Sequence, residues 1–366
     1  MTSKLWNIAS STKPGGLSYR GEIDFIRVAA ALAVIAIHVT SGYTLSGRLA
    51  FALNQTMRFA VPVFVIISGL VNFLPEVTQK WRPAGAYLRH RLSRVLWPYI
   101  LWSLVYVGLT NWQAGQSANW GMVGQYLLAL LTGTGYVHLY FFPIIIQLYG
   151  LYVGLRYWVV KQPAPALIIS LLISLICQTL LYLNQVGLIH LPGSPLTYII
   201  LFPAWLVYFV FGMWLAIDYE GKLNKLRNQL IVLAGFSLIL LMVLLAESRF
   251  LNTGQSSLKP DVLVYSLVIF LFLLASSGRW PFKSAWGEAV LKWLAQQTLF
   301  IFLCHPLFIW LLFRFKPGHW QGNAGMFKLY FIVALMSVLA AYLVSHWKFA
   351  SYIGGTSYVR KKWLLP

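Results

Sequence analysis

Long runs of apolar residues, separated by short polar stretches, repeat along nearly the whole chain. Each run is about 20 residues long, the length at which an α-helix crosses the hydrocarbon core of a bilayer. A shorter apolar stretch, 119–133, predicts a re-entrant or interfacial helix instead. The pattern thus predicts an all-α, polytopic transmembrane helical bundle. Its ten predicted spans lie at about residues 23–43, 52–73, 95–112, 139–160, 165–183, 198–217, 229–246, 261–277, 296–314 and 326–346.

The composition excludes an ordinary water-soluble domain. Of the 366 residues, 59% are hydrophobic and only 10% are charged, whereas soluble domains contain roughly 25% charged residues. A formal net charge of +20 is compatible with nucleic-acid binding. However, the cations fall in short connections between spans, so we expect no nucleic-acid partner.

The distribution of Lys and Arg predicts the orientation of the chain. If the N-terminus lies inside, inner segments contain roughly three times as many Lys and Arg residues as outer segments, in agreement with the positive-inside rule. We therefore predict that both termini are cytoplasmic. The predicted organisation is a cytoplasmic N-terminal segment (1–22), a transmembrane domain (23–346) and a basic cytoplasmic tail (347–366).

The first predicted span contains three ionisable residues, Asp24, Arg27 and His38. Such side chains are costly within a bilayer and are candidates for function. Arg27 and His38 are eleven residues apart, roughly three helical turns, which returns them to nearly the same face and separates them by about 16 Å along the axis. Asp24 lies one turn before Arg27 and is close enough to orient its guanidinium.

A second cationic motif, Arg91 and Arg94, lies at the predicted cytoplasmic end of the third span. Residues three apart are neighbours on a helix, and guanidinium groups bind phosphate oxygens in bidentate fashion. By itself the pair is more often a sign of positive-inside anchoring, and the functional alternative is a site for a nucleotide-bearing polyanion.

Three further positions are candidates with a structural alternative. Ser68, next to Gly69 in the second span, permits close helix packing or lines a ligand path. His138 precedes the fourth span on the outer side, where interfacial histidines are common. His305 lies within the ninth span, directly before Pro306, where we expect a kink. No zinc, P-loop or dinucleotide motif is present, so we expect no metal.

Taken in order, these motifs resemble those of the acyltransferase-3 family of integral membrane acyltransferases. The family has an acidic residue, an Arg, ten residues and a His in its first helix, followed by Pro-x-Phe with Ser-Gly, Arg-x-x-Arg, a His-Leu-aromatic pair and a late His. The matching residues are Asp24, Arg27, His38, Pro62, Phe64, Ser68, Gly69, Arg91, Arg94, His138, Leu139, Tyr140, Phe141 and His305. The family often has Trp where Tyr140 stands.

The resemblance implies acyl transfer from cytoplasmic acyl-CoA, by default acetyl-CoA, to a hydroxyl of an extracytoplasmic glycan or other envelope acceptor. In this interpretation Arg91, Arg94 and Arg27 bind the donor, and His38 is the base. Arg27, oriented by Asp24, is counted with His38 among the catalytic residues. His138, His305, Ser68 and Tyr140 then line the substrate path. The expected location is a bacterial plasma membrane.

The same residues fit two alternative functions less well. A transporter or exporter of an anionic or lipid-linked glycan would use the same intramembrane cations. A scaffold for a polysaccharide synthase would not need them. A separate extracytoplasmic transferase or a polysaccharide synthase is also a possible partner.

Overall fold

The computed structural model describes residues 20–45, 47–78, 83–115, 120–193, 195–251, 253, 256–277 and 284–357. Within these ranges the chain is helical and contains no β-strand, which confirms the predicted fold class. Residues 1–19 of the predicted N-terminal segment and 358–366 of the predicted tail lie outside the described residues.

The elements are α2 (Gly21–Ser41), α3 (Arg48–Thr56), η1 (Met57–Phe59), α4 (Ala60–Thr78), α5 (Ala84–Gln113), α6 (Trp120–Thr132), α7 (Phe141–Lys161), α8 (Pro163–Gln185), α9 (Pro195–Ile199), η2 (Phe202–Trp205), α10 (Leu206–Ala216), α11 (Tyr219–Asn228), α12 (Leu230–Phe250), α13 (Pro260–Ser276), α14 (Ala285–Phe315), α15 (Gly322–Ser345) and η4 (Ala350–Ile353).

The helices follow the predicted spans closely, and the chain is a multi-pass membrane protein. Eight described helices are long and apolar enough to cross a bilayer. The helical stretch Phe202–Ala216 and helix Tyr219–Asn228 are apolar enough only when taken together, and they meet at 100°, which is the geometry of a broken span or a re-entrant loop. The predicted span 261–277 corresponds to α13, which is apolar but has only 17 residues. Helix α6 has 13 residues, too short to cross, as expected for 119–133.

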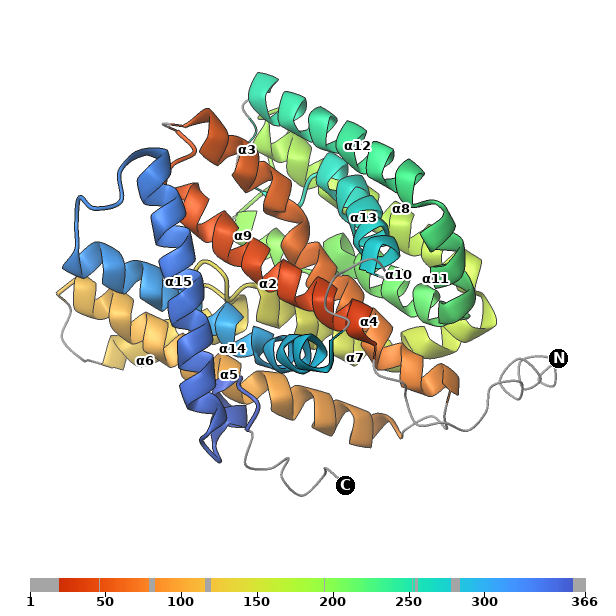
Figure 1. Ribbon diagram of the computed structural model, residues 1–366, viewed down its shortest axis with the longest axis horizontal. Helices are drawn as coiled ribbons and strands as arrows, with labels where there is room; N and C mark the ends of the chain where they lie inside the picture. Colours follow the sequence, from red (N-terminus) through yellow and green to blue (C-terminus); the bar gives the residue numbers. More distant parts are fainter. Residues whose placement is uncertain are drawn as a thin grey trace.

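Helix α2 runs through the middle of the bundle (Figure 1) and packs against α3, α4, α14 and α15. One side of the molecule is formed by α8 and α10 to α13, and the other by α5, α6, α14 and α15 (Figure 1). Other helices therefore surround the ionisable residues of α2 on several sides. This central position makes α2 the element around which a site can be built.

The contact between α4 and α10 depends on two glycines. A β-carbon at Gly69 would overlap the carbonyl oxygen of Phe209, and one at Gly212 would overlap the carbonyl oxygen of Ile66. The backbones can approach this closely only because neither glycine has a side chain. The packing role predicted for Ser68-Gly69 is thus correct for Gly69.

The first part of the predicted C-terminal tail folds against the bundle. Gln297 of α14 donates to the carbonyl oxygen of Thr356 at 2.9 Å and accepts from its amide at 3.0 Å. The indole of Trp102 on α5 donates to the carbonyl oxygen of Ile353 at 3.1 Å. These bonds fix the segment after α15 against the interior turns of α5 and α14.

Candidate functional site

One polar cluster forms at the N-terminal end of α2. The guanidinium of Arg27 forms an ion pair with Asp24 at 3.4 Å, one helical turn away, and both side chains are mostly buried. Tyr149 of α7 and Arg91 of α5 lie within electrostatic reach of Arg27. Helix α5 begins at Ala84, well before the predicted span, so Arg91 lies within its N-terminal third. Arg27 of α2 and Arg91 of α5 are thereby brought close together.

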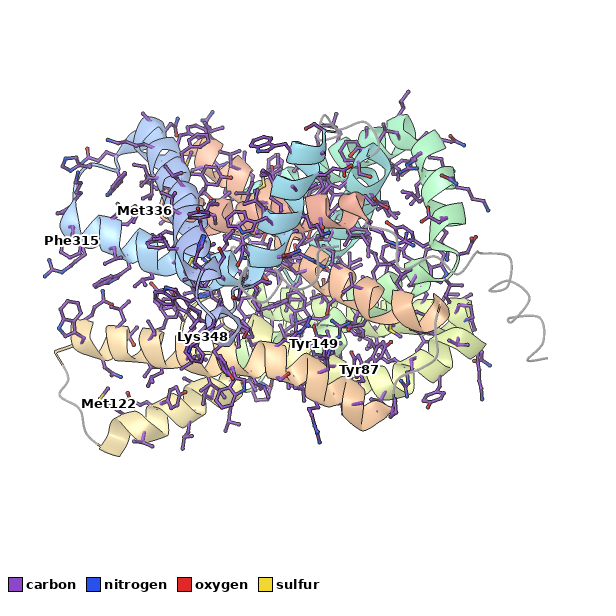
Figure 2. All side chains as sticks on the ribbon, turned by 60° about the horizontal axis from the view of Figure 1, so that its bottom comes forward. Tyr87, Met122, Tyr149, Phe315, Met336 and Lys348 are labelled. Carbon is purple, nitrogen blue, oxygen red and sulfur yellow. The ribbon has the colours of Figure 1, made fainter. Side chains whose placement is uncertain are left out.

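The same cluster includes Ser68 of α4. Its hydroxyl donates to the hydroxyl oxygen of Tyr149 at 3.1 Å. Tyr149 in turn lies beside Tyr87, with ring centroids 6.4 Å apart, and the two labels lie next to each other in Figure 2. We call Asp24, Arg27, Ser68, Arg91 and Tyr149 the arginine cluster.

Arg94 does not join this cluster in the way that its spacing from Arg91 suggested. Its side chain is exposed on α5, whereas the side chain of Arg91 is half-buried and its Nε is fully buried. The two residues are neighbours on the helix, but they lie at different angles to the bundle. The structure therefore places Arg91, rather than the pair, beside Arg27.

Three histidines meet at the other end of α2. The ring centroids of His38 and His305 are 5.1 Å apart, those of His138 and His305 are 5.6 Å apart, and those of His38 and His138 are 6.2 Å apart. His305 comes from the interior of α14 and His138 from the turn before α7. Residues 38, 138 and 305 are distant in sequence, and tertiary packing alone assembles this histidine cluster.

His138 lies deeper than an interfacial residue would. The turn that precedes α7 folds back on itself at Gly133, whose φ of +70° favours glycine. A β-carbon at Gly133 would lie 2.6 Å from the Cα of Tyr140. The folded turn places His138, with 1% exposure, against the ring of Tyr106 at 5.2 Å.

The three imidazoles differ in exposure and in hydrogen bonding. His305 is fully buried, and its Nδ1 lies 3.2 Å from the carbonyl oxygen of Ile301. Nε2 of His305 has no hydrogen-bond partner among the described residues, and the imidazole of His138 lies within reach of the backbone of Leu303. His38 keeps partial exposure, although it lies inside the bundle. Each neutral imidazole has one donor and one acceptor nitrogen, so the cluster can exchange hydrogen bonds with a polar group that enters beside His38.

The exposure of His38 is explained by a cavity of about 360 Å³. The histidine cavity, as we name it, is lined partly by apolar side chains and partly by imidazole, hydroxyl and guanidinium groups. Its lining residues are Val34, Ile37, His38, Ser41, Arg58, Val61, Val137, His138, Tyr140, Ile199, Trp205, Ser256, Ser257, Leu258 and Phe302. His305 forms the wall behind His38 without lining the cavity itself.

A group of aromatic rings lies between the histidine cavity and the arginine cluster. The rings of Phe64, Phe141 and Phe302 are in mutual contact, with centroids 5.5 to 6.3 Å apart. Phe302 lines the cavity, and Phe64 lies one helical turn before Ser68. No residue of the arginine cluster is among the described residues that line the cavity. Arg27 and His38 thus lie toward opposite ends of α2, with these aromatic rings between them.

Sequence reasoning missed two cations of the site. Arg58 and Lys259 look like ordinary outer-loop residues, yet their exposures are 7% and 0%. Arg58 lines the cavity. Lys259 donates to Glu247 at 2.5 Å and to Ser248 at 2.6 Å, at the base of the loop that supplies Ser256 to Leu258. For Arg58 the only available signal was its position four residues before Pro62.

Together these features define a class of protein: a multi-pass helical membrane protein with imidazole groups and a guanidinium around a buried cavity. The family model described as "Acyltransferase domain" matches residues 20–346, and the chain belongs to the acyltransferase-3 family. This confirms the resemblance drawn from the motifs.

Similar proteins include several named "Probable poly-beta-1,6-N-acetyl-D-glucosamine export protein" from strains of Staphylococcus aureus. That of strain MSSA476 is 25% identical over 360 residues, which cover 93% of this chain and 97% of the relative. A "Serine/alanine racemase" of Enterococcus gallinarum is 27% identical over 296 residues, which cover 78% of this chain and 40% of that protein. No solved structure matches the chain.

Proposed function

We propose that the protein transfers an acyl group, expected to be acetyl, from cytoplasmic acyl-CoA to a hydroxyl of an extracytoplasmic surface glycan. The observation that most supports this proposal is the histidine cluster, because it places a partly exposed imidazole in a membrane-embedded cavity beside other polar groups. Membership of the acyltransferase-3 family supports the reaction class. The polymer named in the staphylococcal relatives supports a polysaccharide acceptor.

The two clusters suggest separate places for donor and acceptor. Asp24, Arg27 and Arg91 lie in the N-terminal parts of α2 and α5, the ends of these helices that the Lys and Arg distribution assigns to the cytoplasm. Guanidinium groups there suit the phosphates of a CoA donor. The histidine cavity borders the opposite connections, through Ser41, Val137 and Ser256, and suits an acceptor that arrives from outside.

In the proposed reaction His38 is the general base. A neutral imidazole takes a proton from the acceptor hydroxyl as its oxygen attacks the thioester carbonyl carbon. The new C–O bond forms, the C–S bond breaks, and the proton passes to the departing thiolate. His305 and His138 hold the His38 ring from two sides, and Tyr140 lines the acceptor side.

Export of an unmodified polymer is the second candidate, because the staphylococcal relatives are named as export proteins. The two functions are separable in proteoliposomes that contain the full chain, with radiolabelled acetyl-CoA on one side and a β-1,6-linked N-acetylglucosamine oligosaccharide on the other. Acyl transfer predicts label on the oligosaccharide. Passage of unlabelled oligosaccharide, with no label above a protein-free control, would favour export and reject the enzyme.

A further inference from the structure

The proposed reaction needs a group that stabilises negative charge on the acyl carbonyl oxygen. When the acceptor oxygen attacks, the carbonyl π electrons move onto that oxygen, and the resulting oxyanion is costly in a cavity with an apolar lining. The described lining residues supply hydroxyls, imidazoles and one guanidinium, that of Arg58. Arg58 is 7% exposed, so the cation is held inside the protein, where its charge is little screened.

A hydrogen-bond chain ties Arg58 to the helical turn that presents His38. Arg58 donates through Nη2 to Oδ1 of Asn54, one turn earlier in the chain. Asn54 donates through Nδ2 to the carbonyl oxygen of Ile37 at 3.0 Å and to the hydroxyl of Thr40 at 3.0 Å. Asn54 itself is fully buried. The side chain of Asn54 therefore links the guanidinium of Arg58 to the turn of α2 that carries His38.

The charge of Arg58 also acts on the reactive side of the cavity. His38 and Tyr140 both lie within electrostatic reach of the guanidinium. Arg58 belongs to η1, the single turn between α3 and α4, and Phe59 next to it packs on Tyr265. The side chain is thus set by a short rigid connection rather than by a long loop.

We propose that Arg58 is a catalytic residue that binds the acyl carbonyl oxygen in the histidine cavity and stabilises the oxyanion formed during transfer. The inference rests on the acyl transfer proposed above. As the acceptor oxygen bonds to the carbonyl carbon, its proton moves to His38 and the carbonyl electron pair moves toward the guanidinium. When that pair returns, the C–S bond breaks and the thiolate leaves with the proton.

The test compares Arg58→Gln and Arg58→Lys with wild type in the proteoliposome assay, normalised to inserted protein. Removal of one preorganised oxyanion donor lowers kcat by about 100- to 1,000-fold in other enzymes. We expect that loss for Arg58→Gln, a smaller loss for Arg58→Lys, and an unchanged donor KM for both. Arg48→Gln, an exposed cation on neighbouring α3, is the matched control and should keep wild-type turnover.

Several results would overturn the proposal. These are a kcat for Arg58→Gln within threefold of wild type, equal losses for the Gln and Lys variants, or a change confined to acceptor KM. Partial recovery of Arg58→Ala turnover by added guanidinium ion is expected, since a packing role would not respond to it. If the Arg58 variants do not insert, Asn54→Ala keeps the charge and releases its anchor, with about a tenfold loss of kcat expected. An unchanged kcat in that variant would also overturn the assignment.

Turnover by wild type is measured first in the same vesicles. Absence of wild-type transfer refutes the proposed function as a whole. Wild-type transfer with full activity in Arg58→Gln refutes only the role of Arg58.

Discussion

Replacement of His38 by Ala is the most direct perturbation of the histidine cavity. His38 is the member of the histidine cluster that belongs to the central helix and is partly exposed to the cavity. Its removal enlarges a space that already exists. In contrast, His305 is fully buried, and its replacement by Ala would leave a new enclosed void, which is destabilising.

The difference in exposure gives two separate expectations. For His38→Ala we expect kcat to fall by about 100- to 10,000-fold, the usual contribution of a positioned general base. At about 1.36 kcal/mol for each factor of ten, this corresponds to a barrier increase of about 2.7 to 5.4 kcal/mol. We expect the thermal midpoint to stay near that of wild type. For His305→Ala we expect a lower midpoint together with a loss of activity.

The assay is transfer of label from acetyl-CoA to the oligosaccharide in proteoliposomes, paired with thermal unfolding of the same detergent-purified protein. His190→Ala is the matched control, because His190 is exposed and does not line the cavity. Retention of more than a tenth of wild-type kcat by His38→Ala would show that this imidazole is not the base. A large drop in its midpoint would show that the loss is structural.

Three other predictions concern the surroundings of the site. Arg91→Ala should raise the Kd for acetyl-CoA at least tenfold, since Arg91 lies beside Arg27. Arg94 is exposed, so Arg94→Ala should raise the Kd less. Equal increases of the Kd in a direct binding assay would contradict the assigned geometry. Gly69→Ala should destabilise the α4–α10 contact by about 1 to 3 kcal/mol. The control is Gly235→Ala, where a β-carbon meets open space. Equal thermal midpoints for the two variants would be inconsistent with that contact. Lys259→Met should lower the free energy of unfolding by about 3 to 5 kcal/mol, because it removes the buried cation that pairs with the partly exposed carboxylates of Glu247 and Asp261. An unchanged midpoint would argue against this network.

Much of the fold was predictable because apolar length is a strong signal in a membrane. All ten predicted spans fall on helices, and the spacing of Arg27 and His38 placed both on the interior side of α2. The prediction was less accurate where helices extend beyond the apolar core. Helix α14 begins at Ala285, eleven residues before the predicted span, because its first turns are amphipathic rather than uniformly apolar.

The candidate site was predicted in part. The motifs identified His38, His138 and His305 as residues of interest, but nothing in their spacing indicates that the three rings lie 5 to 6 Å apart. Arg58 and Lys259 were missed because the sequence does not show whether a cation near the end of an apolar run reaches water or folds into the protein. Only the hydrogen bonds of Asn54 and the carboxylate of Glu247 distinguish the two cases.

The sequence by itself determined that this chain is a helical membrane protein of the acyltransferase-3 type, with ionisable residues in its first span. Those properties follow from local composition and short motifs, which act within one helix. The tertiary structure decided which ionisable residues share a site. It divided them into an arginine cluster and a histidine cavity at opposite ends of α2, because that division depends on how α4, α5, α7 and α14 pack around the central helix. Such long-range packing leaves no periodic trace in the sequence of any single helix.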